Sequence, residues 1–136
     1  MERKYPQLEI DLAALYSNAQ QVIRRCQERH IRVCGVVKGV DGLPEVARVL
    51  RQAGAEELGT SRLEQVERCR AAGIGGPWLL IRIPGLSELP AAVALCETSL
   101  QSERTTLDAL EAECVRQGRT HRVIVMADRG DLREGF

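Results

Sequence analysis

Lys38 is the residue whose type and setting say most about possible chemistry. The chain has only two lysines, Lys4 and Lys38, and takes the rest of its positive charge from arginine. A surface cation can equally be an arginine, whereas an imine with an aldehyde requires a primary amine. Lys38 directly follows the apolar pair Val36-Val37, so it stands where a strand would end. A strand-end lysine that only extends into water is the simpler alternative, and position alone leaves both open.

A charged segment at 128–135 is the second candidate. It reads Asp-Arg-Gly-Asp-Leu-Arg-Glu-Gly, with charges of both signs around Gly130 and Gly135. Two glycines favour a tight loop, and its side chains could project into a crevice at the strand ends. From the residues alone, a solvated surface turn is the simpler alternative.

Other common chemistries find little support in the sequence. The five cysteines contain no CxxC pair and the chain has only His30 and His121, so no metal site is expected. Neither histidine lies near a GxSxG turn, and the glycines after Lys38 match neither a P-loop nor a GxGxxG motif. The formal net charge is zero and aromatic residues make up 3% of the chain, so nucleic acid is not an expected partner.

The elements that would carry these residues repeat one pattern, a short apolar strand followed by an amphipathic helix. A first helix is predicted to begin at the cap Asp11, and Ser61 with Glu64 predicts a capping box for a later one. The strands are predicted at 31–37, 57–59, 78–83, 98–101 and 122–127. This pattern predicts an α/β fold, either an open parallel sheet or the first portion of an eight-stranded barrel. The carboxyl ends of parallel strands meet at one edge, so Lys38 and Asp128 are expected at the same edge.

Length and composition predict one compact unit. At 136 residues, with 44% hydrophobic residues, the chain could bury a modest single core. Its N-terminus has no signal-peptide hydrophobic segment, and no apolar run is long enough to cross a bilayer. A cytoplasmic protein without a membrane partner is therefore expected.

Five short motifs, in order along the chain, resemble the alanine/ornithine racemase family, and most closely its ornithine racemase branch. They lie at 5–12, 35–38, 58–62, 80–84 and 128–136. The resemblance implies a partial TIM-type (β/α) barrel with about the first five parallel strands, so that residues 1–136 form a single, incomplete N-terminal domain. It also implies pyridoxal 5'-phosphate as cofactor, held by Lys38 through an imine. Arg133 is then expected to position the cofactor's phenolic oxygen, and Asp128 matches the family's strand-end aspartate.

The function that the resemblance implies is that of a racemase, an isomerase acting on a small amino acid such as ornithine. Two departures argue against alanine racemase itself and leave the substrate open. Alanine racemases carry a tyrosine in the register of Gly42, and a lysine in the register of Met126.

The family's later strands carry the phosphate cradle and the partner of the pyridine nitrogen, so this chain looks incomplete. Two alternatives to a racemase therefore stay open, a non-catalytic protein that binds and buffers pyridoxal phosphate and an inactive truncated fragment. Open strand edges favour association, so a homo-oligomer that covers the barrel edges is also expected.

Overall fold

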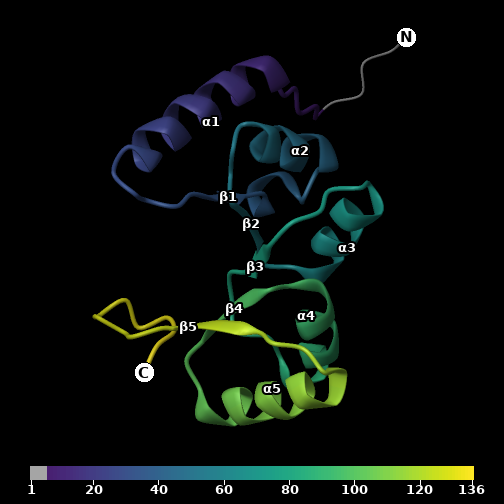
Figure 1. The fold of residues 1–136 in the computed structure, drawn as a ribbon, viewed down its shortest axis with the longest axis vertical. Coiled ribbons are helices and arrows are strands. Elements are labelled where there is room, and N and C mark those ends of the chain that lie inside the picture. The colour runs from purple at the N-terminus through teal and green to yellow at the C-terminus, as the bar shows by residue number, and fades with distance from the viewer. Residues whose placement is uncertain (1–5) are drawn as a thin grey trace.

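The computed structural model describes residues 6–136 and shows one helix followed by five strands with a helix between successive strands (Figure 1). The helices are α1 (Leu12–Gln27), α2 (Pro44–Gln52), α3 (Leu63–Ala71), α4 (Leu89–Leu95) and α5 (Arg104–Gln117). The strands are β1 (Cys34–Val36), β2 (Glu57–Thr60), β3 (Trp78–Leu80), β4 (Thr98–Gln101) and β5 (Arg122–Val125). Two short 3-10 turns, η1 (Lys38–Val40) and η2 (Leu86–Glu88), come after β1 and β3.

All five strands form one parallel sheet in the order β1-β2-β3-β4-β5. Gly35 pairs with Leu58 at one end of the sheet, and Leu100 pairs with Ile124 at the other. Parallel neighbours need a crossover connection, and α2 to α5 supply one between each pair of strands. The predicted α/β class with five successive parallel strands is therefore confirmed.

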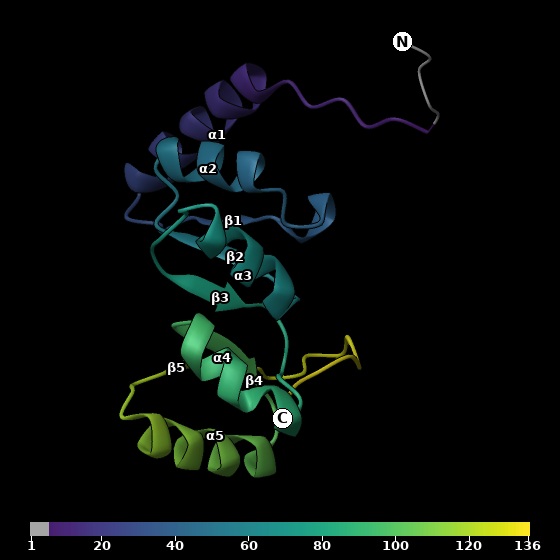
Figure 2. The same ribbon diagram turned by 90° about the vertical axis from the view of Figure 1, so that its right-hand side faces the viewer.

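The core lies between the sheet and the helices, which cover one face of it (Figures 1 and 2). Side chains of a strand alternate between faces, and the residues that point toward the helices are fully buried. They include Val37, Leu58, Trp78 and Leu80, each 0% exposed. Val66 of α3 joins them in the same apolar cluster. This packing fixes the position of each strand end, where the candidate residues lie.

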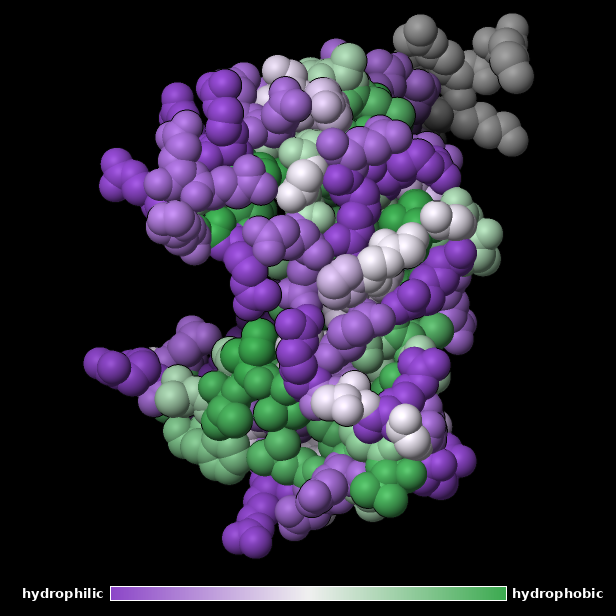
Figure 3. All heavy atoms as spheres, in the orientation of Figure 1, coloured by the Kyte–Doolittle hydropathy of each residue, from purple (hydrophilic) through white to green (hydrophobic). Residues whose placement is uncertain are grey.

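The opposite face of the sheet is hollow and open to solvent, as the left side of Figure 3 shows. Cys34, Leu79 and Ile124 line a depression of about 360 Å³ there. Polar groups join the strands across it, because Glu57 accepts a hydrogen bond from Thr98 at 3.3 Å and pairs with Arg122 at 3.4 Å. A parallel sheet that has curved without closing into a barrel leaves its concave, inner face open in this way.

β5 is the most exposed strand of the sheet. Every one of its residues is exposed, including Val123 at 40%, Ile124 at 44% and Val125 at 59%. A parallel strand is usually buried on both faces, so β5 has apolar surface that nothing in residues 6–136 covers.

Several element boundaries differ from the sequence-based prediction. β1 begins at Cys34 and not at Ile31, because Ile31 still donates to the carbonyl of Cys26 at 2.9 Å in a turn where His30 has φ of 57°. Residues 8–10, which precede α1, form no strand. The cap at Asp11 is confirmed, since its Oδ1 accepts from the amides of Ala13 and Ala14 at 3.0 and 2.9 Å.

The predicted capping box at Ser61 is wrong. Arg62 occupies the N-cap position of α3, with no side-chain hydrogen bond to the helix. A side-chain bond of the capping type forms instead before α4, where Glu88 accepts from the amide of Gly85 at 2.8 Å. The same carboxylate also binds Arg82, so the turn after β3 is tied to its own helix.

Candidate functional site

Lys38 stands directly after β1 at the carboxyl end of the sheet. The preceding residue, Val37, is buried and donates to the carbonyl of Gly59 at 2.9 Å, so the backbone is anchored to β2 up to this point. Lys38 itself is exposed and opens the turn η1. Within residues 6–136 its side chain forms no hydrogen bond or ion pair. Its amine is therefore available to a ligand at this edge.

The turn after Lys38 is closed by its own backbone. The amide of Asp41 donates to the carbonyl of Lys38 at 3.2 Å, and the amide of Gly42 donates to that of Val37 at 3.0 Å. Asp41 has φ of 52° and Gly42 has φ of 63°, both in the left-handed region. A side chain at Gly42 would also collide with Gln65, whose Cβ lies 2.5 Å from where a Cβ would be. The tyrosine register of alanine racemases therefore has no room for a side chain here.

Asp128 shapes the loop after β5. Its Oδ1 accepts from the amide of Gly130 at 2.8 Å and from that of Leu132 at 3.2 Å. These two hydrogen bonds, the one from Gly130 first, hold the pKa of the Asp128 carboxyl below its usual value. The carboxylate is thus engaged by its own loop, and its role is to set the loop's path.

The loop then folds back on the end of β5. Phe136 donates to the carbonyl of Met126 at 2.9 Å and accepts from the amide of Asp128 at 3.2 Å. Gly135 has φ of 146°, and a Cβ there would lie 2.2 Å from the backbone nitrogen of Asp128. The segment 128–136 is therefore a tight loop that depends on glycine.

Arg133 projects from this loop into solvent. Its side chain is 69% exposed, and its only ion pair among residues 6–136 is with the adjacent Glu134, at 3.9 Å. Figure 2 shows the loop, in yellow, on the same side of the sheet as the turn after β1. Three strands separate β1 from β5, and no hydrogen bond or ion pair within 6–136 joins Lys38 to Arg133. The two residues share an edge of the sheet without touching.

Arg82, another polar residue at this edge, is not available to a ligand. Its Nε donates to the carbonyl of Ser61 at 2.6 Å, and its two terminal nitrogens donate to the carboxylate of Glu88 at 2.7 and 2.6 Å. The hydrogen bonds to Glu88 raise the pKa of the Arg82 guanidinium. Arg82 therefore joins the ends of β2 and β3.

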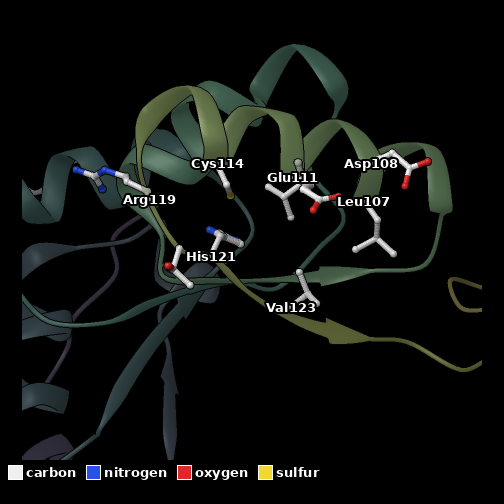
Figure 4. A pocket seen from close by; sticks show the side chains of 9 residues that line it. Leu107, Asp108, Glu111, Cys114, Arg119, His121 and Val123 are labelled. Atoms are coloured by element: carbon white, nitrogen blue, oxygen red, sulfur yellow. The ribbon is translucent and has the colours of Figure 1, made fainter.

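A hollow of the described chain lies away from these residues. It measures about 370 Å³ and lies between α5 and β5 (Figure 4). There the sulfur of Cys114 points from the helix toward His121 and Val123 on the strand side. Lys38, Asp128 and Arg133 do not line it.

Sequence reasoning missed the support beneath the Lys38 turn. Gln65 of α3 donates to Asp41 at 2.8 Å, and Arg68 of the same helix donates to the Asp41 carbonyl at 2.9 Å. The pair Asp41-Gly42 was a signal of a left-handed turn, since both residue types tolerate positive φ. Which helix would contact that turn could not be read from the sequence.

Neither a metal centre nor a membrane span appears in the described part of the chain. Among residues 6–136, no three His, Cys, Asp or Glu side chains gather in a way that could hold a metal ion. No helix in that range has the length and apolar character needed to cross a membrane.

Solved structures share this fold. A D-threonine aldolase from Filomicrobium marinum matches 97% of this chain and 37% of its own, with a TM-score of 0.83 at 21% identity. An alanine racemase from Streptomyces lavendulae matches 93% of this chain and 33% of its own, with a TM-score of 0.77 at 31% identity. The second match supports the interpretation of the open, curved sheet as part of a TIM-type barrel.

Curated proteins of similar sequence are racemases. A lysine racemase of Thermotoga maritima is 37% identical over 96% of this chain, and an ornithine racemase of Acetoanaerobium sticklandii is 30% identical over 97%. The chain spans only about 37% of the length of either. The family model described as "Alanine racemase, N-terminal domain" matches residues 10–136. This chain therefore belongs to the alanine racemase N-terminal domain family.

Proposed function

We propose that this chain is the N-terminal part of a pyridoxal-phosphate-dependent amino-acid racemase, and that residues 1–136 form one unit of its cofactor-binding barrel. The observation that carries the proposal is the position of Lys38, an exposed primary amine without a partner in 6–136 at the carboxyl end of β1. Active sites of such barrels lie at that end of the strands. Membership in the racemase family adds independent support.

The residues at this edge fit one end of the cofactor. An aldehyde needs a primary amine, which Lys38 provides, and a phenolic oxygen is well matched by a guanidinium, which Arg133 provides. Asp128 contributes indirectly, because its hydrogen bonds to Gly130 and Leu132 hold the loop that presents Arg133. The fit therefore rests on two side chains that follow the two outer strands, β1 and β5, at the shared carboxyl end of the sheet.

When bound, the cofactor supplies an electron sink for the charge that develops at the α-carbon of the amino acid. Lys38 then has two roles. Its amine holds the cofactor in place, and once released it can take or return the proton at the α-carbon. Arg133 orients the ring through its oxygen.

For the substrate we propose a basic amino acid, ornithine or lysine. Two curated relatives have those substrates in their names, each over nearly the whole of this chain. The environment of Gly42 supports the choice, because its positive φ and the contact with Gln65 exclude the tyrosine found there in alanine racemases.

Trapping the cofactor on the chain tests the proposal. After incubation with pyridoxal phosphate and reduction with borohydride, peptide mass spectrometry should find the adduct on Lys38. Lys38→Arg keeps the charge but cannot form the bond, and should lose both the adduct and the associated absorbance. Lys4→Arg is the matched control and should keep both. A wild-type chain that carries no more adduct on Lys38 than on Lys4 would refute the assignment.

A second measurement separates a racemase from a protein that only binds the cofactor. The chain with pyridoxal phosphate is incubated with L-ornithine, L-lysine or L-alanine, and the enantiomers are separated by chiral chromatography. Conversion of at least one of them identifies a racemase, whereas adduct without conversion is the result expected of a protein that only binds the cofactor or of a part of a racemase that is inactive by itself. Size-exclusion mass compared with 15.1 kDa tests the proposed homo-oligomer in the same preparation.

A further inference from the structure

The amine of Lys38 can be held in place only through its backbone. Its side chain is exposed and has no partner within residues 6–136, so the position of the amine depends on the turn that begins at Lys38. Three backbone hydrogen bonds close that turn, from Val40 and Gly42 to Val37 and from Asp41 to Lys38, at 3.0 to 3.2 Å. A turn of five residues at a solvent edge needs outside support to keep one conformation.

That support comes from one buried amide on the next helix. Gln65 of α3 is 4% exposed, and its Nε2 donates to Oδ1 of Asp41 at 2.8 Å. Its Oε1 accepts a hydrogen bond from the hydroxyl of Thr60, the fully buried last residue of β2. The amide therefore joins the end of β2 to the turn that carries Lys38.

Further contacts fix the same link. Gln65 packs directly against Gly42, where no larger residue fits, and Cys69 donates to the Gly42 carbonyl at 3.4 Å. Arg68 donates to the carbonyl of Asp41 at 2.9 Å and to its Oδ2 at 3.3 Å. The hydrogen bond from Gln65, followed by those from Arg68, lowers the pKa of the Asp41 carboxyl, so it accepts them in its charged form at neutral pH.

We propose that Gln65 is a positioning residue for Lys38. Its buried amide holds the Lys38 turn against the end of β2, so that the amine meets an aldehyde at one defined place. Gln65 itself touches neither the amine nor the reacting atoms. The inference rests on the proposed function, because it assumes that Lys38 is the residue that bonds the cofactor.

The test compares Gln65→Met with Gln101→Met. Both glutamines are buried, at 4% and 0% exposure, but Gln101 lies on β4 and does not contact the Lys38 turn. Methionine keeps the length of the side chain and removes its hydrogen bonds, two at Gln65 and one at Gln101. Each protein is treated with pyridoxal phosphate and borohydride, and the ratio of adduct on Lys38 to adduct on Lys4 is measured by mass spectrometry. Lys4 serves as an internal reference for general amine reactivity.

We expect Gln65→Met to lower the Lys38 to Lys4 ratio by about tenfold, the size expected when a hydrogen bond to a charged group is lost. Amide exchange of Asp41 and Gly42 should rise by a similar factor. Gln101→Met should change neither the adduct ratio nor the amide exchange of this turn, even if it lowers the melting temperature as much as Gln65→Met does.

Conservative replacement supplies a second check. Asp41→Asn keeps an oxygen acceptor for Gln65 and tolerates the left-handed backbone, so it should retain most of the ratio, whereas Asp41→Ala should behave like Gln65→Met. An unchanged ratio in Gln65→Met, with the wild-type adduct on Lys38, would overturn the positioning role and leave the proposed function intact. Failure of the wild-type chain to form the Lys38 adduct would instead overturn the proposed function, and the positioning role with it.

Discussion

The difference between the two faces of the sheet can be measured by deleting apolar atoms on each. Leu58 of β2 points toward the helices and is 0% exposed, whereas Ile124 of β5 faces the open hollow and is 44% exposed. Leu58→Ala and Ile124→Ala both shorten an aliphatic side chain in a strand. The structure predicts that the two substitutions lower the free energy of unfolding by very different amounts.

Burial sets the size of each effect. Truncation of a fully buried leucine leaves a cavity and costs about 2–5 kcal/mol, and the dense cluster around Leu58 favours the middle of that range, about 3 kcal/mol. In a chain of this size such a loss lowers the melting temperature by about 10 °C. Ile124 retains nearly half of its exposure to water, so its truncation removes little burial and should cost about 1 kcal/mol or less.

The loss of stability in each variant is measured by thermal and urea denaturation, with circular dichroism as the signal. Runs at several protein concentrations show whether association contributes to stability. Equal losses for the two variants would refute the conclusion that the inner face of β5 is open. If the loss for Ile124→Ala also grew with concentration, that face would be an interface between copies.

The loop after β5, two thiols of raised pKa and the half-buried His121 each give a further prediction. Gly135→Ala should strain the loop by about 1–3 kcal/mol and speed its amide exchange, whereas unchanged exchange would contradict the geometry of the loop. Burial raises the pKa of Cys34 to about 11 and that of Cys96 to about 12, so both thiols are protonated at pH 8. Iodoacetamide should label the buried Cys96 only after unfolding and the half-buried Cys34 slowly before it. Burial lowers the pKa of His121, so the unfolded chain binds its proton first and stability should fall as pH drops below about 6.5 toward the folded value. His121→Asn should reduce that slope in unfolding titrations between pH 7.5 and 5.5.

Sequence periodicity predicted the elements of the fold better than their ends. The apolar runs around Leu58, Leu79 and Val123 lie within three of the observed strands, because a buried parallel strand needs a continuous apolar segment. The start of β1 was placed too early, because the left-handed turn at His30 extends the end of α1. The predicted cap at Ser61 failed because Arg62 occupies the N-cap position and no side chain binds that end of α3.

The candidate site, too, could be predicted from the sequence only in part. Lys38 and Asp128 could be placed at one edge from the sequence, since each comes directly after an apolar run and parallel strands end together. The support beneath Lys38 could not, because Gln65 lies 24 residues from its partner Asp41 and pairs with it only after α3 packs on the sheet. Sequence order locates the residue next to a strand end, but it does not identify the distant side chain that contacts that residue.

The contact between Glu57 and Arg122 bears on how such a barrel is assembled. These residues belong to β2 and β5, which would lie about 14 Å apart across a flat sheet, at roughly 4.8 Å for each strand spacing. Their 3.4 Å ion pair, together with the 3.3 Å bond from Thr98, spans the concave side of the sheet and favours its arc over a flat ribbon. Side chains within these 136 residues therefore favour the curvature of the sheet by themselves.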